Sequence, residues 1–327
     1  MESRKGCNKV GWRYGVMCGL FLVAGIVYSL IYHKLFTVEQ QEAYKVNASF
    51  IATIIIVDMI CFPVIYFLCK KLQKAEIKKQ TLGAKKFILG ITYCAAFVVI
   101  GAILGAIVNV VFGYMLTGEI SNNTAVAELM LNSGFFMRVL SVGILAPIFE
   151  ELIFRKVLVD HLAPYGKKLA IVTSGLLFGL FHGNFAQFFF ATFLGWFFAY
   201  VYVSTGKIRY TIFYHMIINC STSIVTMALI GPIMKLSEDA DLAVAIAADP
   251  SIVVPALLFF IWMGGIFVTA IVGLILFILN MKKMTVVEDG QKPSVGASFA
   301  SIFSSWGMWI FIAICIFMIL DNYLGWL

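Results

Sequence analysis

The sequence predicts an all-α fold, a polytopic transmembrane helical bundle of about 8–9 helices. Two observations predict it first: 61% of the 327 residues are hydrophobic and only 13% are charged, a composition unsuited to soluble domains. A third is that apolar runs of about 20 residues, the length that crosses a hydrocarbon core of about 30 Å, recur along the whole chain. Lipid is therefore the expected solvent for most of the surface.

Apolar runs long enough to span the membrane occur nine times. They cover approximately residues 14–35, 48–68, 87–116, 135–161, 168–184, 185–203, 210–230, 253–279 and 302–320. The fourth, fifth and seventh are the least apolar, because they contain ionisable and amide side chains. No soluble insert interrupts the series, so we expect one membrane domain over 1–327. Its catalytic core is expected at about 135–230, with accessory helices at 14–116 and 253–320.

The distribution of charge predicts the orientation, since Lys and Arg accumulate in short cytoplasmic loops. With a cytoplasmic N terminus, all but four of the 24 basic residues lie on the cytoplasmic side. Acidic residues gather on the opposite face, notably between residues 236 and 249. The net charge of +7 is then explained by basic loops beside anionic membrane lipid, and it requires no nucleic-acid partner.

Two adjacent carboxylates stand in the fourth span, in the order Glu150, Glu151 and, four residues later, Arg155. An ionisable side chain within a membrane helix is costly unless it is paired or hydrated, so each one indicates a functional site. Glu151 and Arg155 share a helix face at positions i and i+4 and are expected to pair. Glu150 points about 100° away from that pair and is expected to be the reactive carboxylate.

Two further spans carry the remaining polar groups of this set. The fifth ends at His182, four residues after Phe178, and the seventh carries His215 and Asn219 one helical turn apart. Approximate depths along these helices, at about 1.5 Å per residue, make convergence in a cavity reached from the cytoplasmic side plausible. His215, which is shallower, fits least well.

Such a cluster suits hydrolysis by an activated water. A carboxylate buried in apolar surroundings holds a proton more tightly than one in water, so Glu150 is suited to act as a general base, with His182 sharing the attacking water. His215 and Asn219 offer N–H donors for the oxyanion of a tetrahedral intermediate. Taken singly, each residue also has a purely structural reading, as a helix-surface pair or a core histidine.

The three elements Glu150-Glu151-x-x-x-Arg155, Phe178-x-x-x-His182 and His215-x-x-x-Asn219, in this order on separate helices, resemble the motifs of the CAAX protease and bacteriocin-processing family, also called Abi. The resemblance covers about residues 141–223. It implies an intramembrane endopeptidase in which Glu150, His182, His215 and Asn219 are catalytic and Glu151 with Arg155 supports the site. It also implies a bacterial cytoplasmic membrane and a peptide or lipid-modified peptide as substrate.

Alternatives to this reading concern the metal and the activity. Zinc is a rival, since Glu and His are admissible ligands, but no His-Glu-x-x-His motif is present and Asn219 is a poor zinc ligand. Metal-independent chemistry with no cofactor is preferred. A non-catalytic bacteriocin-immunity or membrane-protein partner with the same fold is the main alternative function, and a proton-coupled transporter ranks last. The sequence assigns no oligomeric state.

Overall fold

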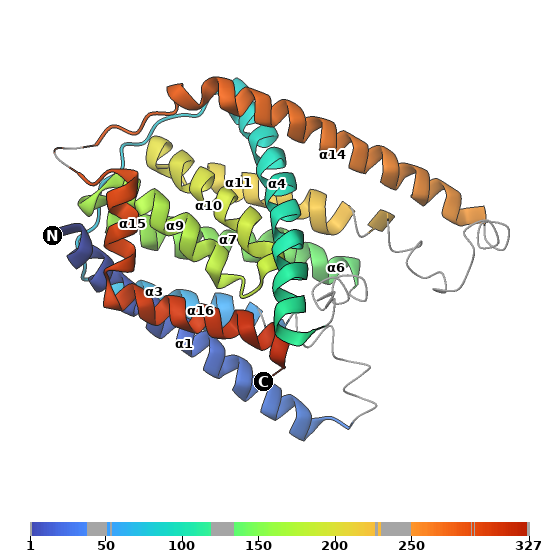
Figure 1. The fold of residues 1–327 in the computed structure, drawn as a ribbon, viewed down its shortest axis with the longest axis horizontal. Helices are drawn as coiled ribbons and strands as arrows, with labels where there is room; N and C mark the ends of the chain where they lie inside the picture. The colour runs from blue at the N-terminus through green and yellow to red at the C-terminus, as the bar shows by residue number, and fades with distance from the viewer. Residues whose placement is uncertain are drawn as a thin grey trace.

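The structure, a computed structural model, describes residues 2–37, 51–52, 54–118, 134–225, 228–229, 250–288, 290 and 292–325. All regular secondary structure in these residues is helical (Figure 1). The α-helices are α1 (Glu2–Leu35), α3 (Phe62–Cys69), α4 (Ala84–Thr117), α6 (Phe135–Met137), α7 (Ala146–Glu151), α8 (Leu158–Leu162), α9 (Lys167–Phe181), α10 (Phe185–Thr205), α11 (Arg209–Asn219), α14 (Val253–Asn280), α15 (Val295–Phe303) and α16 (Trp306–Leu324).

Wider π-helical turns extend several of these helices. They are η1 (Ile54–Cys61) before α3, η2 (Arg138–Leu145) and η3 (Leu152–Val157) on either side of α7, and η5 (Cys220–Val225) after α11. The segment from α6 to α8 is therefore one helical rod in which α7 lies between two π-helical stretches. Short 3₁₀ turns occur at η4 (Ala163–Tyr165), η6 (Pro250–Ile252) and η7 (Met281–Lys283).

The predicted membrane character is confirmed. Helix occupies most of the described part of each predicted apolar span. Among the described residues, five helical segments are long and apolar enough to cross a membrane by length and composition, namely Glu2–Leu35, Ala84–Thr117, Phe185–Thr205, Pro250–Lys283 and Trp306–Leu324. The polar helices that carry the predicted site are not among these five. The acidic stretch 236–249 lies outside the described residues, and the orientation of the chain in the membrane stays a prediction.

One predicted span has the wrong bounds. Residues 302–320 were expected to form one helix, but α15 ends at Phe303 and α16 begins at Trp306. Ser305 separates them because its hydroxyl accepts from the backbone N–H of Met308 and so begins a new helix. The same hydroxyl donates to the side-chain oxygen of Asn8 at 2.6 Å, which fixes the break against α1.

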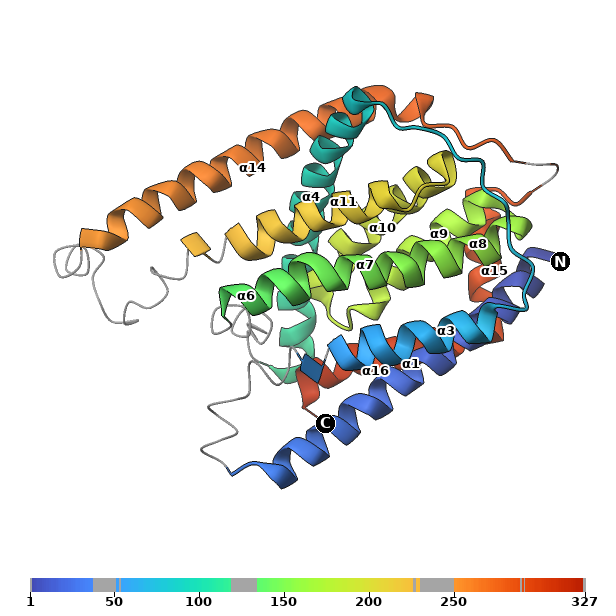
Figure 2. The same cartoon turned by 180° about the vertical axis from the view of Figure 1, so that it is seen from behind.

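The helices form layers that pack through glycine. In Figures 1 and 2, α1, α3 and α16 lie together on one side, α7, α9, α10 and α11 form the middle, and α14 runs along the opposite side. Gly101 and Gly105 of α4 face the backbone of α10, where added Cβ atoms would lie 2.3 Å from the Cα of Phe190 and 2.7 Å from the carbonyl of Phe185. Small residues thus allow the close approach expected between membrane helices.

Two extended segments cover one end of the middle layer. In the first, between α3 and α4, the backbone N–H of Ala75 donates to the carbonyl of Asp160 and that of Gln80 to the carbonyl of Thr205, both at 2.7 Å. In the second, after η7, Glu288 accepts the first two backbone N–H groups of α9, from Lys167 and Lys168, at 2.8 Å each. A carboxylate at a helix N terminus satisfies donors that lack a partner within the helix.

Candidate active site

A buried ion pair anchors the site. The Arg155 Nε lies 3.1 Å from the Glu151 Oε2, and both side chains are fully buried. The guanidinium carbon lies 4.3 Å from the ring centroid of Phe178 and 5.3 Å from that of Phe198, so two aromatic faces enclose the cation. The pairing expected from the i, i+4 spacing is therefore present, and a paired charge can persist where an isolated one would be costly.

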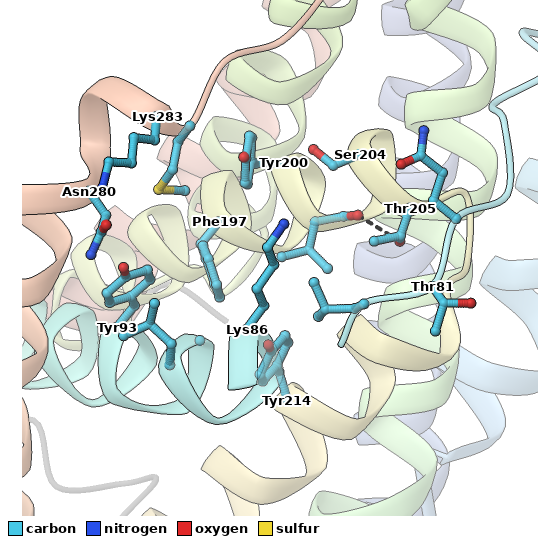
Figure 3. A pocket seen from close by; sticks show the side chains of 16 residues that line it. Thr81, Lys86, Tyr93, Phe197, Tyr200, Ser204, Thr205, Tyr214, Asn280 and Lys283 are labelled. Carbon is cyan, nitrogen blue, oxygen red and sulfur yellow. Dashed lines mark hydrogen bonds between the residues drawn. The ribbon is translucent and has the colours of Figure 1, made fainter. Parts of the chain in front are cut away.

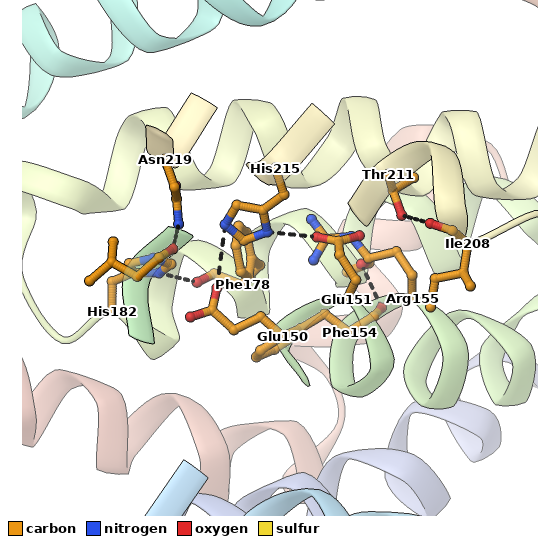
Figure 4. Close-up of polar contacts among 12 residues, drawn as sticks. Glu150, Glu151, Phe154, Arg155, Phe178, His182, Ile208, Thr211, His215 and Asn219 are labelled. Carbon is orange, nitrogen blue, oxygen red and sulfur yellow. Dashed lines mark hydrogen bonds and ion pairs between the residues drawn. The ribbon is translucent and has the colours of Figure 1, made fainter. Parts of the chain in front are cut away.

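His215 lies between the two glutamates (Figure 4). Its Nδ1 is 3.1 Å from the Glu151 Oε1, and its Nε2 is 3.7 Å from the Glu150 Oε2. Because an ionised carboxylate only accepts hydrogen bonds, the proton of this contact belongs on the Nδ1 of His215. The histidine expected to fit least well is thus the one in closest contact with the acidic residues.

The two neighbouring carboxylates differ in exposure and in partners. Glu151 is completely buried, and its two oxygens face Arg155 and His215. Glu150 keeps 18% of its side chain exposed, and its Oε2 lies 3.7 Å from the Nε2 of His215. Adjacent positions on α7 therefore place one carboxylate in a fixed network and the other at an accessible edge.

His182 is held at the end of α9 by its own helix. Its Nδ1 lies 2.8 Å from the carbonyl of Phe178, so this nitrogen carries a proton and the Nε2 of the neutral ring accepts. Gly183, with φ of 65°, then turns the chain. Asn184 caps α10, because its side-chain oxygen accepts from the backbone N–H of Gln187 at 2.9 Å and its amide donates to the carbonyl of His182 at 2.8 Å.

This turn was not identified from the sequence. Gly183 and Asn184 stand between two apolar runs, which is a turn and N-cap signal, and it would have shown that the backbone around His182 is fixed by local hydrogen bonds. Phe178 was noted only as a motif position. In the structure its ring packs edge-to-face against His182 and His215, with centroids 4.9 and 5.7 Å apart, besides lying under Arg155.

Asn219 completes the cluster from α11. Its side-chain amide donates to the carbonyl of Val142 in η2 at 2.9 Å. The amide nitrogen carries two protons, so this bond orients the group and leaves the second proton for another acceptor. Figure 4 shows Asn219, His182, His215 and Glu150 directed toward one another from three segments of the chain, with Glu151 and Arg155 on the far side of His215.

All six residues predicted for the site therefore lie in one cluster. Its walls come from α7, η3, α9 and α11, and the rings of His182 and His215 both pack against the ring of Phe178. Within the described ranges, no group of three or more His, Cys, Asp or Glu side chains is arranged to hold a metal ion. The groups in reach are one accessible carboxylate, two imidazoles and an amide, which are suited to moving protons and binding an oxyanion.

The fold and this cluster define a class, an integral membrane protein with several apolar helices and a carboxylate and histidine site inside a helical bundle. Residues 132–221 match the family described as type II CAAX prenyl endopeptidase Rce1-like. The chain therefore carries a domain of the Rce1-like CAAX endopeptidase family, and that domain includes all six residues of the cluster. The predicted family is confirmed.

One curated relative also matches. It is described as "Putative membrane peptidase YdiL" of Bacillus subtilis (strain 168) and is 34% identical over 130 residues, which are 39% of this chain and 50% of the relative. The chain thus spans about half the length of that protein. No solved structure matches the chain. Both descriptions concern peptidases, and neither mentions bacteriocin immunity.

Proposed function

We propose that this protein is an intramembrane glutamate-type endopeptidase that hydrolyses a peptide bond in a membrane-associated or lipid-modified peptide. The observation that carries the proposal is the arrangement of His215 between two unlike carboxylates, one buried against Arg155 and one at an accessible edge. Support comes from the family match, since residues 132–221 contain every member of the cluster.

Glu150 is the general base in this proposal. Glu151 is engaged by Arg155 and His215, so Glu150 is the carboxylate available to take a proton from water. The Nε2 of His182 accepts the other hydrogen of that water, because Phe178 already holds the Nδ1 proton. A general base that is positioned in this way typically contributes about 10²–10⁴-fold in rate.

His215 and Asn219 stabilise the oxyanion. Asn219 has a second amide proton to donate beside the one that Val142 accepts. His215 donates from Nε2 only if the ring carries both protons, since Nδ1 already donates to Glu151. The Glu151 carboxylate is placed to compensate the charge of that doubly protonated ring, because Glu150 holds the proton from water at this stage. Glu151 is therefore a positioning residue in this proposal, acting on the reaction through His215.

The reaction follows from these roles. Glu150 removes a proton from water as the oxygen forms a bond to the peptide carbonyl carbon, and the carbonyl oxygen becomes an anion held by His215 and Asn219. The protonated Glu150 then gives its proton to the peptide nitrogen, the carbon–nitrogen bond breaks, and the oxyanion reforms a carbonyl. The products are a carboxylic acid and an amine, and Glu150 returns to its ionised form.

Peptide profiles of membranes from cells expressing the full chain test this function. Glu150→Gln keeps the size of the side chain but removes the base, so we expect the cleaved peptides made by the wild type to decrease by about 10²-fold or more. Glu76→Gln, the same change on an exposed residue of the first extended segment, serves as the matched control and should leave the profile unchanged.

Three results would contradict the proposal. If the Glu150→Gln membranes release the same peptides at the same rate, the carboxylate is not a base. If a cellular effect of the protein survives Glu150→Gln while no peptide differs between wild type and variant, the protein acts as a non-catalytic partner. A proton-coupled flux lost in Glu150→Gln, again without any change in peptides, would indicate a transporter instead.

A further inference from the structure

A second cavity lies apart from the six-residue cluster. It has a volume of about 400 Å³ and is bounded by the first turns of α4, the last turns of α10, the end of α14 and residues 80–82 of the first extended segment (Figure 3). Lys86 of α4 and Lys283 of η7 are exposed at this cavity. No aspartate or glutamate lines it, so the charge at the cavity is positive.

Neither lysine is neutralised by the described part of the protein. Lys86 and Lys283 have no ion-pair partner among those residues, in contrast to Lys156, whose Nζ lies 2.8 Å from the Asp160 Oδ2. Neutral polar groups, including those of Tyr93, Ser204 and Asn280, line the cavity as well. Two cations beside neutral hydrogen-bonding groups fit an anion that also carries hydroxyl or ester oxygens.

An apolar cavity of about 530 Å³ adjoins the first. Phe197, Tyr200 and Met284 line both cavities, so the two share a wall. The apolar cavity is otherwise bounded by side chains such as Ile100 of α4 and Trp196 of α10. The Trp196 indole N–H donates to the carbonyl of Val172 at 3.0 Å, which leaves a hydrocarbon face toward the space.

We propose that the paired cavities bind one anionic phospholipid, with its phosphate between Lys86 and Lys283 and an acyl chain in the apolar cavity. The charge complementarity at one end and the hydrocarbon lining at the other match the two ends of this molecule. A soluble anion would use only the first cavity, and an uncharged lipid only the second. The proposal does not depend on the proposed peptidase function.

Native mass spectrometry of the delipidated full chain in detergent tests the site. Phosphatidylglycerol and phosphatidylcholine with the same acyl chains are titrated separately. One molecule of phosphatidylglycerol should bind to each protein chain, and it should bind more tightly than phosphatidylcholine does. Lys86→Gln with Lys283→Gln should weaken the binding of phosphatidylglycerol by about tenfold or more. Lys85→Gln with Lys282→Gln removes the same charge from neighbouring exposed positions that do not line the cavity and should leave binding intact.

Ile100→Trp tests the apolar half independently, because the larger ring occupies the space for the acyl chain and leaves both lysines in place. The Ile100→Trp variant should bind phosphatidylglycerol more weakly than the wild type does. Glycerol 3-phosphate, which lacks acyl chains, should not displace phosphatidylglycerol from the wild type when it is added at the concentration at which the lipid saturates the site. The proposal is overturned if the two double-lysine variants lose affinity equally, if the two lipids bind equally well, or if Ile100→Trp binds phosphatidylglycerol as the wild type does.

Discussion

The helix α10 in the middle layer and the helix α14 at the edge are both apolar, yet they meet different surroundings. In the most apolar 18-residue stretch of α10, 61% of the residues are buried inside the protein. In the corresponding stretch of the segment that contains α14, only 11% are buried. α10 packs on α4 and α9 and supplies Phe198 to the surroundings of Arg155. α14 presents large apolar side chains such as Phe260 and Ile261 on its surface.

This difference shows how the molecule accommodates charge. The residues that would be costly in lipid, above all Glu151 and Arg155, are enclosed by other helices rather than by the bilayer. α14 needs few polar partners, because its sequence carries almost no polar groups. Changes to the enclosed region should therefore have large effects, and changes to α14 should have small ones.

The largest effect on stability is expected from Arg155→Ala. It leaves the Glu151 carboxylate buried without its cation and removes the group between the rings of Phe178 and Phe198, which typically destabilises by about 3–5 kcal/mol. Thermal unfolding of the purified protein in detergent measures the loss. Lys74→Ala, which removes one positive charge from an exposed position of the first extended segment, is the control and should cost far less.

A double replacement sharpens this result. Glu151→Gln together with Arg155→Met removes both charges, so it should recover part of the stability lost in Arg155→Ala. If Arg155→Ala unfolds at the wild-type temperature, the ion pair of Glu151 and Arg155 contributes nothing to the stability of the fold. The expected difference between the enclosed and outer helices would then be wrong for the most deeply buried charges.

An intermediate effect is expected from Gly101→Ala, where α4 meets α10. The new Cβ would lie 2.3 Å from the Cα of Phe190, and backbone atoms cannot move aside as a side-chain tip can. The helices must separate, at a cost of about 1–3 kcal/mol, the usual range for overpacking. The unfolding temperature should fall, and an unchanged temperature would show that the two helices do not touch at this position.

Much of the site could be predicted because its polar residues lie in short motifs within apolar spans. The pairing of Glu151 with Arg155 follows from helical spacing, and the cost of buried charge made the cluster a candidate functional site. The position of His215 between both glutamates could not be predicted, since it depends on how α11 packs against α7. The depth of His215 was estimated along its own helix alone, without the packing of α11 against α7, and the estimate therefore made His215 the least suitable member of the cluster.

The outer helices could be predicted from the sequence more accurately than the segments that enclose the site. α4 and α14 follow directly from continuous apolar sequence, to within a few residues at their ends. The π-helical stretches around α7 leave no recognisable pattern in the sequence. The cap of α9 by Glu288 joins residues about 120 positions apart, and local patterns carry no information about such a contact. The break at Ser305 could have been suspected from the serine pair, but apolar residues continue on both sides.

The smallest effect, with the opposite sign, is expected from Gly264→Ala in α14. An added Cβ meets no described atom within 4 Å, so nothing in the packing opposes the methyl group. Alanine restricts the unfolded chain and favours helix by up to about 1 kcal/mol relative to glycine. The unfolding temperature should stay constant or rise slightly, in contrast to the fall expected for the identical change at Gly101. Equal falls for the two variants would mean that α14 is packed as closely as α4, and the distinction between enclosed and lipid-facing helices would no longer hold.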